Sequence, residues 1–214
     1  MDTLFEDDQL LVINKPAGTI VEGPAKDGLE SLETQLSSRF DKPIFPCHRL
    51  DKDTTGVLVF AKTKAALTAV SEQFAKRRVR KTYLVCLDGQ WDPGWNRVDT
   101  KIQRLPDQRM ANSTEGKEAV TTFRRLAFWN GKSLVEALPK TGRTHQIRLH
   151  CLFHQCPVSG DKLYATVTDD QPPMALHAWQ LRFQHPTSGD PLILKAPLPD
   201  YWHTHWLKDC PVDM

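Results

Sequence analysis

The sequence of 214 residues lacks any apolar run long enough to cross a membrane. It also lacks the features of a secretory signal or a transit peptide, because it opens with the acidic segment Met-Asp-Thr-Leu-Phe-Glu-Asp-Asp. Its five cysteines form no Cys-x-x-Cys pair, and their odd number argues against a complete disulfide framework. We therefore expect free thiols, a cytoplasmic location and no partnership with a membrane.

The sequence also has little net charge. A formal charge of +2 gives no global indication of nucleic-acid binding. One local segment differs, because it packs five cations into six residues: Lys76, Arg77, Arg78, Arg80 and Lys81. Such a basic cluster can meet phosphate groups, with an attraction that weakens as salt rises. The alternative is a solvated helix end, where cations are favoured by the backbone dipole.

No internal repeat, low-complexity tract or long linker divides the chain. Its length fits one domain over residues 1–214, with room for two lobes around a cleft. The tail at 201–214 contains two tryptophans, and it either packs on the body as a helix or frays.

Hydrophobic periodicity and turn residues predict an α+β fold with a mixed, mostly antiparallel β-sheet core and flanking helices. Polar loops are expected at 22–28, 106–118 and 166–173, and a hairpin turn at 185–189. Helices are expected at 31–40 and 63–78, and a turn that continues as a helix at 142–154. Strands are expected at 10–13, 57–61, 83–87, 98–104, 119–127, 133–138, 176–183 and 192–195.

The most informative segment is His-Arg-Leu-Asp-Lys-Asp-Thr-Thr-Gly at residues 48–56. It places the carboxylate of Asp51 in a loop directly before an apolar run that reads as a buried strand. Loops fixed by a rigid core are common sites of catalysis. Taken alone, however, an aspartate before a strand is more often a turn or cap residue.

This segment resembles the catalytic motif of the RluA-type pseudouridine synthases. Three other segments resemble motifs of that family in the same order: Asn-Lys-Pro-Ala-Gly at 14–18, Lys-Thr-Tyr at 81–83, and Thr-Gly-Arg-Thr-His-Gln-Ile-Arg-Leu-His at 141–150. The resemblance runs from about residue 10 to about residue 197. It implies a pseudouridine synthase-like fold with a central cleft, an isomerase that acts on uridine in RNA, and no cofactor. The family's S4-like N-terminal RNA-binding domain is expected to be lacking, because the first motif begins so early.

The resemblance also assigns the catalytic residues. Asp51 matches the family's essential aspartate, whose charge suits a sugar that becomes positive as the base leaves. Arg148 matches the basic residue of the third motif, and we expect it to pair with Asp51 and to keep it ionised. Tyr83 matches the family tyrosine, whose ring can stack on the flipped uracil and whose hydroxyl could take part in proton transfer at C5. Without the motif, Tyr83 would read as a core tyrosine and Arg148 as a phosphate-binding or surface cation.

Structured RNA, either ribosomal or transfer RNA, is the expected partner, and we expect a monomer without an obligatory protein partner. The resemblance assigns Arg49 to the place vacated by the flipped base. His48 either stacks or forms a hydrogen bond within the loop, and Arg143 is the expected phosphate contact together with the basic cluster. Lys15 is expected to be structural, reaching RNA or a backbone carbonyl.

The sequence leaves three alternatives to this interpretation. The neighbouring His150, Cys151, His154 and Cys156 suggest zinc, but no distant ligand pair has the usual spacing, so no metal is expected. A base-removing C1′ hydrolase would need a second carboxylate, for which nothing supports Asp53. A non-catalytic RNA-binding module would be indicated by loss of the catalytic residues, all of which are present.

Overall fold

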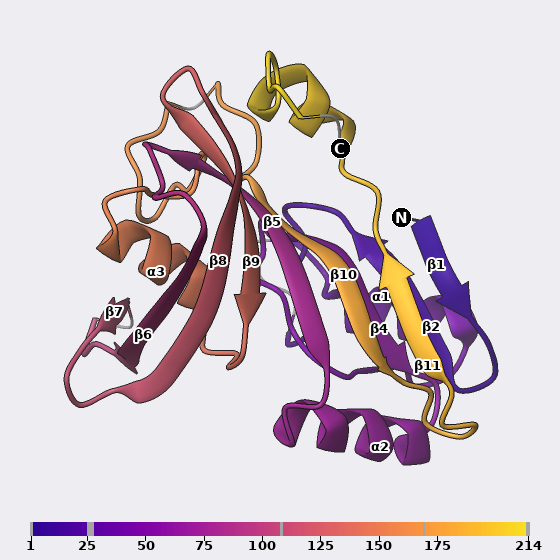
Figure 1. Cartoon of the computed structure of the whole chain (residues 1–214). Helices are drawn as coiled ribbons and strands as arrows, with labels where there is room; N and C mark the ends of the chain where they lie inside the picture. Colours follow the sequence, from indigo (N-terminus) through magenta and orange to yellow (C-terminus); the bar gives the residue numbers. More distant parts are fainter. Residues whose placement is uncertain (1, 25–27, 108, 169, 213–214) are drawn as a thin grey trace. The chain divides into compact units, whose positions relative to one another are not determined.

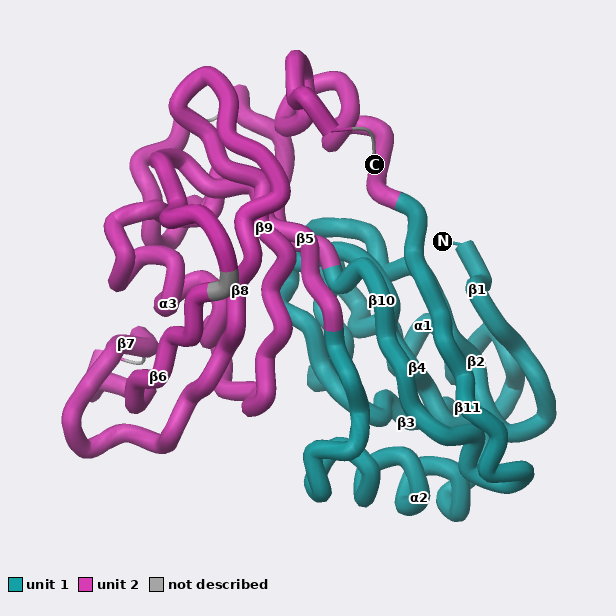
Figure 2. The backbone as a smooth tube through the Cα atoms, in the orientation of Figure 1, with its two compact units in different colours: residues 1–81, 178–197 teal, residues 82–177, 198–214 magenta. Residues whose placement is uncertain are grey.

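The computed structural model describes residues 2–24, 28–107, 109–168 and 170–212. Parts of three predicted loops (25–27, 108 and 169) and the last two residues of the predicted tail lie outside this range. The chain forms two compact units (Figure 2). Unit 1 contains residues 1–81 and 178–197, and unit 2 contains residues 82–177 and 198–214. Within the described residues, no helix has both the length and the apolar character needed to cross a membrane.

Unit 1 is built on a set of paired strands (Figure 1). Its strands follow the order β1-β2-β4-β10, with β3 paired to β4 and β11 paired to β10. The registers of β1 with β2, β2 with β4, β3 with β4, and β10 with β11 are all antiparallel. The bounds are Asp2–Glu6 (β1), Leu10–Lys15 (β2), Phe45–Pro46 (β3), Thr55–Ala61 (β4), Leu176–Gln184 (β10) and Pro191–Lys195 (β11).

Two helices cover opposite faces of this sheet. Helix α1 (Leu32–Phe40) packs with Leu11, Ile13, Leu58 and Phe60. Helix α2 (Lys64–Ala75) packs on the side that holds the alternate residues of the same strands, Leu10, Val12, Val57 and Val59. Because successive strand residues point to opposite faces and both faces are covered, the runs Leu10–Ile13 of β2 and Val57–Ala61 of β4 must be apolar. All seven residues of β4 are accordingly buried.

Side chains at the helix ends determine where these helices begin. Ser31 accepts a hydrogen bond from the Thr34 amide at 3.3 Å, and Thr63 accepts one from the Ala66 amide at 3.1 Å. Both are N-caps that satisfy an otherwise unpaired backbone donor. Helix α2 ends at Ala75, three residues before the predicted end, because Arg77 takes a left-handed φ of 56°.

Unit 2 contains a second run of antiparallel strands, in the order β5-β9-β8-β6-β7. Their bounds are Arg80–Asp88 (β5), Trp95–Arg104 (β6), Met110–Asn112 (β7), Lys117–Trp129 (β8) and Lys132–Pro139 (β9). Helix α3 (Gln146–Phe153) contributes Ile147 and Cys151 to a core with Val85, Phe123 and Val135. Apolar residues of α3 and of the strands β5, β8 and β9 thus form one buried core.

The C-terminal tail packs on unit 2 as a short π-helix, Trp202–Trp206. Trp202 and Trp206 are fully buried, and the Trp206 indole donates to the Pro173 carbonyl at 3.0 Å. The Trp129 indole donates to the Lys208 carbonyl at 3.1 Å. Of the two expected arrangements for the described part of the tail, packing is therefore the observed one.

The predicted α+β class, with mostly antiparallel strands and flanking helices, is confirmed. Three strands were not predicted. β1 lies in the acidic N-terminal segment, β3 has only two residues, and β7 lies inside the segment 106–118 that was predicted to be a loop throughout. The segment 142–154, predicted as a turn that continues as a helix, is confirmed: the helix begins at Gln146, directly after His145 with its left-handed φ of 56°.

Candidate functional site

The loop that carries Asp51 joins β3 to β4 in unit 1. The Thr54 amide donates to the Asp51 carbonyl at 3.1 Å and closes a turn over Lys52 and Asp53. The Asp51 side chain is half-buried. Thr54 and Thr55, which follow, are almost fully buried, so the fixed strand begins within four residues of the carboxylate.

Lys15, at the end of β2, fastens this loop to the sheet. Its side chain is fully buried, and its ammonium donates to the carbonyls of Pro16, Lys52 and Thr54 at 3.0, 2.8 and 2.9 Å. An ammonium has three donors, and all three are used. Burial lowers the pKa of Lys15 to about 7, against the opposing effect of the Asp53 and Asp51 carboxylates. Of the two contacts expected for Lys15, the structure supplies the backbone carbonyls.

His48 is built into the same loop. Its ring stacks on Phe74 with centroids 4.8 Å apart, and its Nε2 accepts a hydrogen bond from the Val59 amide at 3.2 Å. Burial, with the nearby Lys81 charge, lowers the pKa of His48 to about 3, despite a backbone hydrogen bond at Arg49. The neutral ring therefore supports the loop through both stacking and hydrogen bonding.

Arg49 extends from the loop into solvent, with a side chain that is 64% exposed. Its Nη1 donates to the Glu22 carboxylate at 2.9 Å. Glu22 follows Val21, a buried residue of the core beneath α1, and Leu50 packs against that same core. The residues next to Arg49 and next to Glu22 are thus fixed to one hydrophobic cluster.

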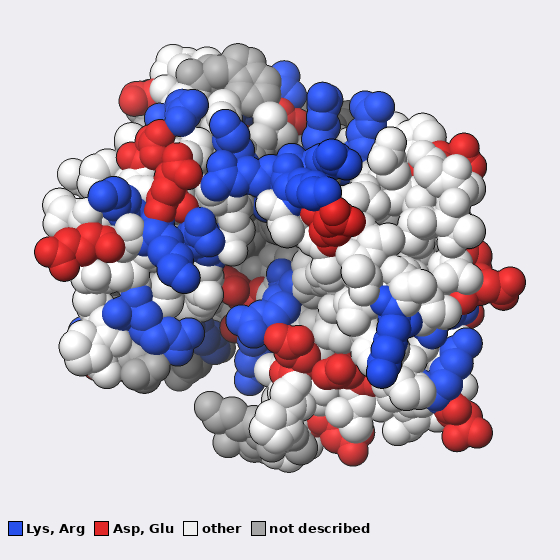
Figure 3. Space-filling model, turned by 90° about the horizontal axis from the view of Figure 1, so that it is seen from below, with Lys and Arg blue, Asp and Glu red and all other residues white. Residues whose placement is uncertain are grey.

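The predicted basic cluster follows α2. Lys76 pairs with Glu72, and the side chains of Lys76, Arg77, Arg78 and Arg80 are all exposed. Lys81 is half-buried in β5, and burial lowers its pKa to about 8. Figure 3 views the side on which α2 lies in Figure 1 and shows lysine and arginine side chains gathered there. Such a surface suits phosphate groups.

In unit 2, Arg148 of α3 is held by a residue that the sequence did not indicate. Its Nε and Nη2 donate to the two carboxylate oxygens of Asp161, each at 2.7 Å, and both side chains are buried. Asp161 also accepts from the amides of Leu163 and Tyr164 at 3.0 and 3.2 Å. The Arg148 guanidinium lies 4.9 Å from the centre of the Tyr164 ring. This fork fixes both the position and the plane of the guanidinium.

Tyr83 and Arg143, the other predicted residues of unit 2, occupy different elements. Tyr83 lies opposite Ala137 in the pairing of β5 with β9, is half-buried and packs against the main core of the unit. Arg143 precedes α3, and its Nε donates to the Glu118 carbonyl at 3.0 Å. The predicted pairing of Arg148 with Asp51 and the RNA contacts stay predictions.

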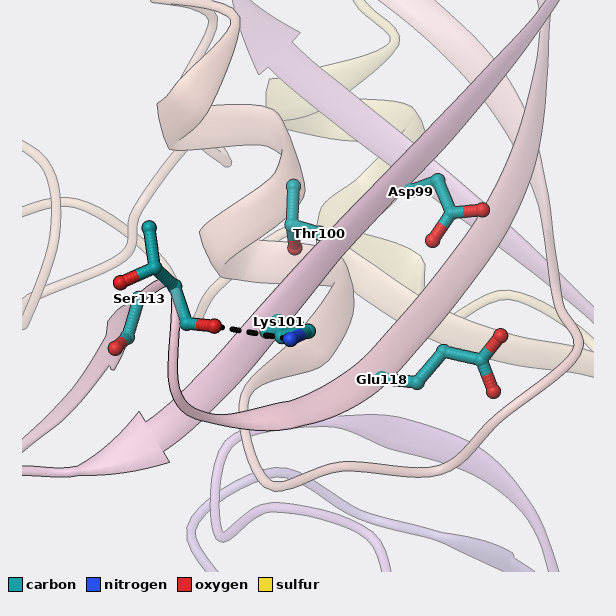
Figure 4. Close-up of a pocket in the computed structure, with 6 residues that line it drawn as sticks. Asp99, Thr100, Lys101, Ser113 and Glu118 are labelled. Atoms are coloured by element: carbon teal, nitrogen blue, oxygen red, sulfur yellow. Dashed lines mark hydrogen bonds between the residues drawn. The ribbon is translucent and has the colours of Figure 1, made fainter.

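A pocket of about 630 Å³ opens at the surface of unit 2 (Figure 4). The Lys101 ammonium on its wall donates to the Thr114 carbonyl at 3.0 Å. Two carboxylates in the lining disfavour a phosphate group there. The lining contains no predicted site residue and consists of Asp99, Thr100, Lys101, Ser113, Thr114 and Glu118.

The histidine and cysteine residues considered as zinc ligands lie in other surroundings: Cys151 and Cys156 belong to the apolar core of unit 2, and the His154 ring lies 5.0 Å from that of Trp91. His150 is fully buried, and its two ring nitrogens lie 3.0 Å from the hydroxyls of Thr100 and Thr121. Burial raises the pKa of the Cys151 thiol well above its ordinary value. Among the residues that the structure describes, no group of three or more His, Cys, Asp or Glu side chains is arranged to hold a metal ion.

Comparison with known proteins shows which family the chain resembles in sequence and fold. A family model described as RNA pseudouridylate synthase matches residues 9–153, a range that includes Asp51, Tyr83 and Arg148. The chain belongs to the RNA pseudouridylate synthase family. The solved structure of human RNA pseudouridylate synthase domain containing 4 aligns with a TM-score of 0.76 at 32% identity, covering 96% of this chain and 91% of that one. The predicted pseudouridine synthase fold is thereby confirmed.

Curated members of the RNA pseudouridylate synthase family carry names that refer to two kinds of RNA. Ribosomal large subunit pseudouridine synthase D of Nitrosomonas europaea is 40% identical over 215 residues, covering 92% of this chain and 62% of that protein. The tRNA pseudouridine synthase C of Vibrio parahaemolyticus is 32% identical over 231 residues, covering 94% of this chain and 92% of that protein. The chain thus spans less than two thirds of the Nitrosomonas relative's length.

The sequence did not predict three residues that contact the expected site residues Arg49 and Arg148. These are Glu22, Asp161 and Tyr164. Asp161 is separated from Arg148 by 13 positions, and Glu22 from Arg49 by 27. No spacing rule for a helix or a strand joins residues so far apart. The one available signal was a buried arginine's need for a carboxylate partner, which does not say which carboxylate supplies it.

Proposed function

We propose that this chain is an RNA pseudouridine synthase that isomerises uridines in ribosomal or transfer RNA, with Asp51 as its catalytic residue. The observation that carries the proposal is that Asp51, in a chain of this family, lies on a loop that is fixed to the sheet. Its carboxylate stands on a loop whose carbonyls are held by a buried ammonium at 2.8 and 2.9 Å. The names of the two relatives support ribosomal and transfer RNA as the substrate classes.

In the proposed reaction the bond between uracil N1 and ribose C1′ breaks, the base rotates, and C5 bonds to C1′. C5 then loses its proton and N1 gains one, so the product is an isomer of uridine. Three roles are open to the Asp51 carboxylate: stabilising the positive sugar, attacking C1′, or removing a proton from C2′. We assign Arg148 the task of keeping Asp51 ionised, because its guanidinium is already oriented by Asp161. Tyr83 would stack on the flipped base, supported by its place beside the core of unit 2.

The RNA is proposed to meet Arg49, Arg143 and the basic cluster. The high exposure of Arg49 supports its part in filling the position of the extruded base. A cytoplasmic location also belongs to the proposal. It is supported by the five free cysteines of the chain, which suit a reducing compartment.

The decisive experiment compares two aspartates of one loop. Asp51→Asn should lower the release of tritium from C5 of labelled uridine by at least about a hundredfold, because the developing charge loses its stabilising partner. Binding of the same RNA should persist. Asp53→Asn, two residues away, is the matched control and should retain turnover. Ribosomal and transfer RNA should both be assayed.

Two results would overturn the proposal. One is full turnover by the Asp51→Asn variant while Asp53→Asn is inactive. The other is release of free uracil in place of pseudouridine, which would assign the chain to base-removing hydrolases.

A further inference from the structure

The ion pair between Arg49 and Glu22 has the features of a built resting position. Within the part of the chain that the structure describes, Glu22 is the partner of the Arg49 guanidinium, and it occupies a single nitrogen at 2.9 Å. Both side chains remain exposed, at 64% and 41%. An arginine used for permanent structural support is usually buried and held by two or more bonds, as Arg148 is here.

The backbone on both sides of this pair is nevertheless fixed. The carbonyls of Ile20 and Val21, directly before Glu22, accept from the amides of Leu32 and Glu33 at 2.9 and 3.0 Å. Val21 and Leu50 pack on one core, so the backbone segments that carry Glu22 and Arg49 are held in place while the two side chains remain exposed. The meeting of the two side chains therefore follows from the fold and needs no further ordering of the backbone.

We propose that Glu22 is a positioning residue that holds Arg49 in a resting place and must release it when RNA binds. The inference rests on the proposed function, in which Arg49 enters the RNA. To enter the RNA among its bases, the guanidinium must leave the Glu22 carboxylate, because the backbone that precedes Glu22 is fixed by its hydrogen bonds to α1. An RNA that offers Arg49 only weak contacts is therefore penalised, which is a means of selecting among RNAs.

The test measures the affinity for RNA in a double-mutant cycle. Glu22→Gln should tighten binding about two- to fivefold, the range expected when an exposed ion pair no longer competes. The effect should appear as a lower KM with an unchanged kcat. In the Arg49→Ala background, the same Glu22→Gln change should have no effect, because no guanidinium remains to be released. Glu30→Gln is the matched control, since it removes one negative charge from the same exposed segment.

Three outcomes would overturn the inference: unchanged affinity for Glu22→Gln, equal tightening for Glu30→Gln, or tightening that persists without Arg49. Each would show that Glu22 acts through general charge or does not act at all. Affinity for RNA is measured separately from turnover. If the wild-type chain formed no pseudouridine, the proposed function would be contradicted, but the double-mutant cycle on RNA affinity could still be interpreted.

Discussion

At the scale of single residues, the charged side chains that fix the candidate site are held by backbone groups as well as by opposite charges. Lys15 uses its three donors on carbonyls, and Asp161 adds two backbone amides to its ion pair with Arg148. Buried charges persist only when their hydrogen-bonding capacity is met. The attachment of the Asp51 loop to the sheet through Lys15 therefore depends on the protonation state of that lysine.

The titration of Lys15 gives a prediction with a definite sign. Burial lowers its pKa to about 7 from a value of 10.5 in the unfolded chain, so between these two values the unfolded state binds more protons. The contribution of Lys15 to the free energy of unfolding must then rise with pH across this window. Compared with Lys15→Met, the wild type should gain about 2–4 kcal/mol between pH 7 and pH 10. Urea unfolding over a pH series measures the difference, and a constant difference would contradict the lowered pKa.

At the scale of elements, the sequence predicted helices and strands correctly where burial of an apolar face determined the residue pattern. β4 and the helices α1 and α2 were predicted because their apolar spacing reflects which faces are buried. β1 was missed because its register carries Asp2 and Glu6 at an exposed edge, where charges are tolerated. β7 was missed because three half-buried residues give no period to read.

Gly56, near the start of β4, is the last residue of the segment that resembles the family's catalytic motif. The structure gives a reason why a glycine stands there. Its φ is +111°, and a Cβ there would lie 2.3 Å from the Ala178 carbonyl oxygen of β10. Gly18 also has a positive φ, of +76°, but a Cβ there would have no neighbour within 4 Å. Substituting each of these two glycines in turn therefore distinguishes the cost of backbone strain, which applies to both, from the cost of crowding between strands, which applies to Gly56 alone.

We expect Gly18→Ala to lower the free energy of unfolding by about 1 kcal/mol, from backbone strain alone. Gly56→Ala should lower it by a further 1–3 kcal/mol, roughly the cost of overpacking, because backbone atoms of β10 must move. Denaturant unfolding of both variants measures the difference. Equal losses would mean that the approach of β10 to Gly56 is not a constraint.

At the scale of the whole molecule, the chain leaves unit 1 after Lys81, returns at Ala178, and leaves it again after Pro197. Motif order predicted which residues form the candidate site, but Asp51 belongs to one unit and Tyr83 and Arg148 to the other. The supporting residues Glu22, Asp161 and Tyr164 could not be predicted, because contacts between distant segments depend on how the chain packs. The same holds for the C-terminal tail, whose tryptophans were visible but whose binding place was not.

That tail yields a prediction about how the molecule unfolds. Trp206 is nearly fully buried, its indole donates to Pro173 at 3.0 Å, and Lys132 lies 5.4 Å from its ring centre. A Cβ at Gly160 would approach the Trp206 ring to 2.8 Å, so the indole fills a space that this glycine leaves open. Trp206→Ala should therefore destabilise unit 2 by about 3–5 kcal/mol.

If each unit opens cooperatively by itself, the loss should be local. Hydrogen exchange of Trp206→Ala should show lower protection in residues 82–177, with residues 1–81 and 178–197 little changed. Leu36→Ala is the matched control, because Leu36 is equally buried in the core of unit 1 and should give the reverse pattern. A uniform loss of protection in both variants would mean that the two units unfold as one body. Stability and the support of Asp51 and Arg148 would then be a single property of the chain.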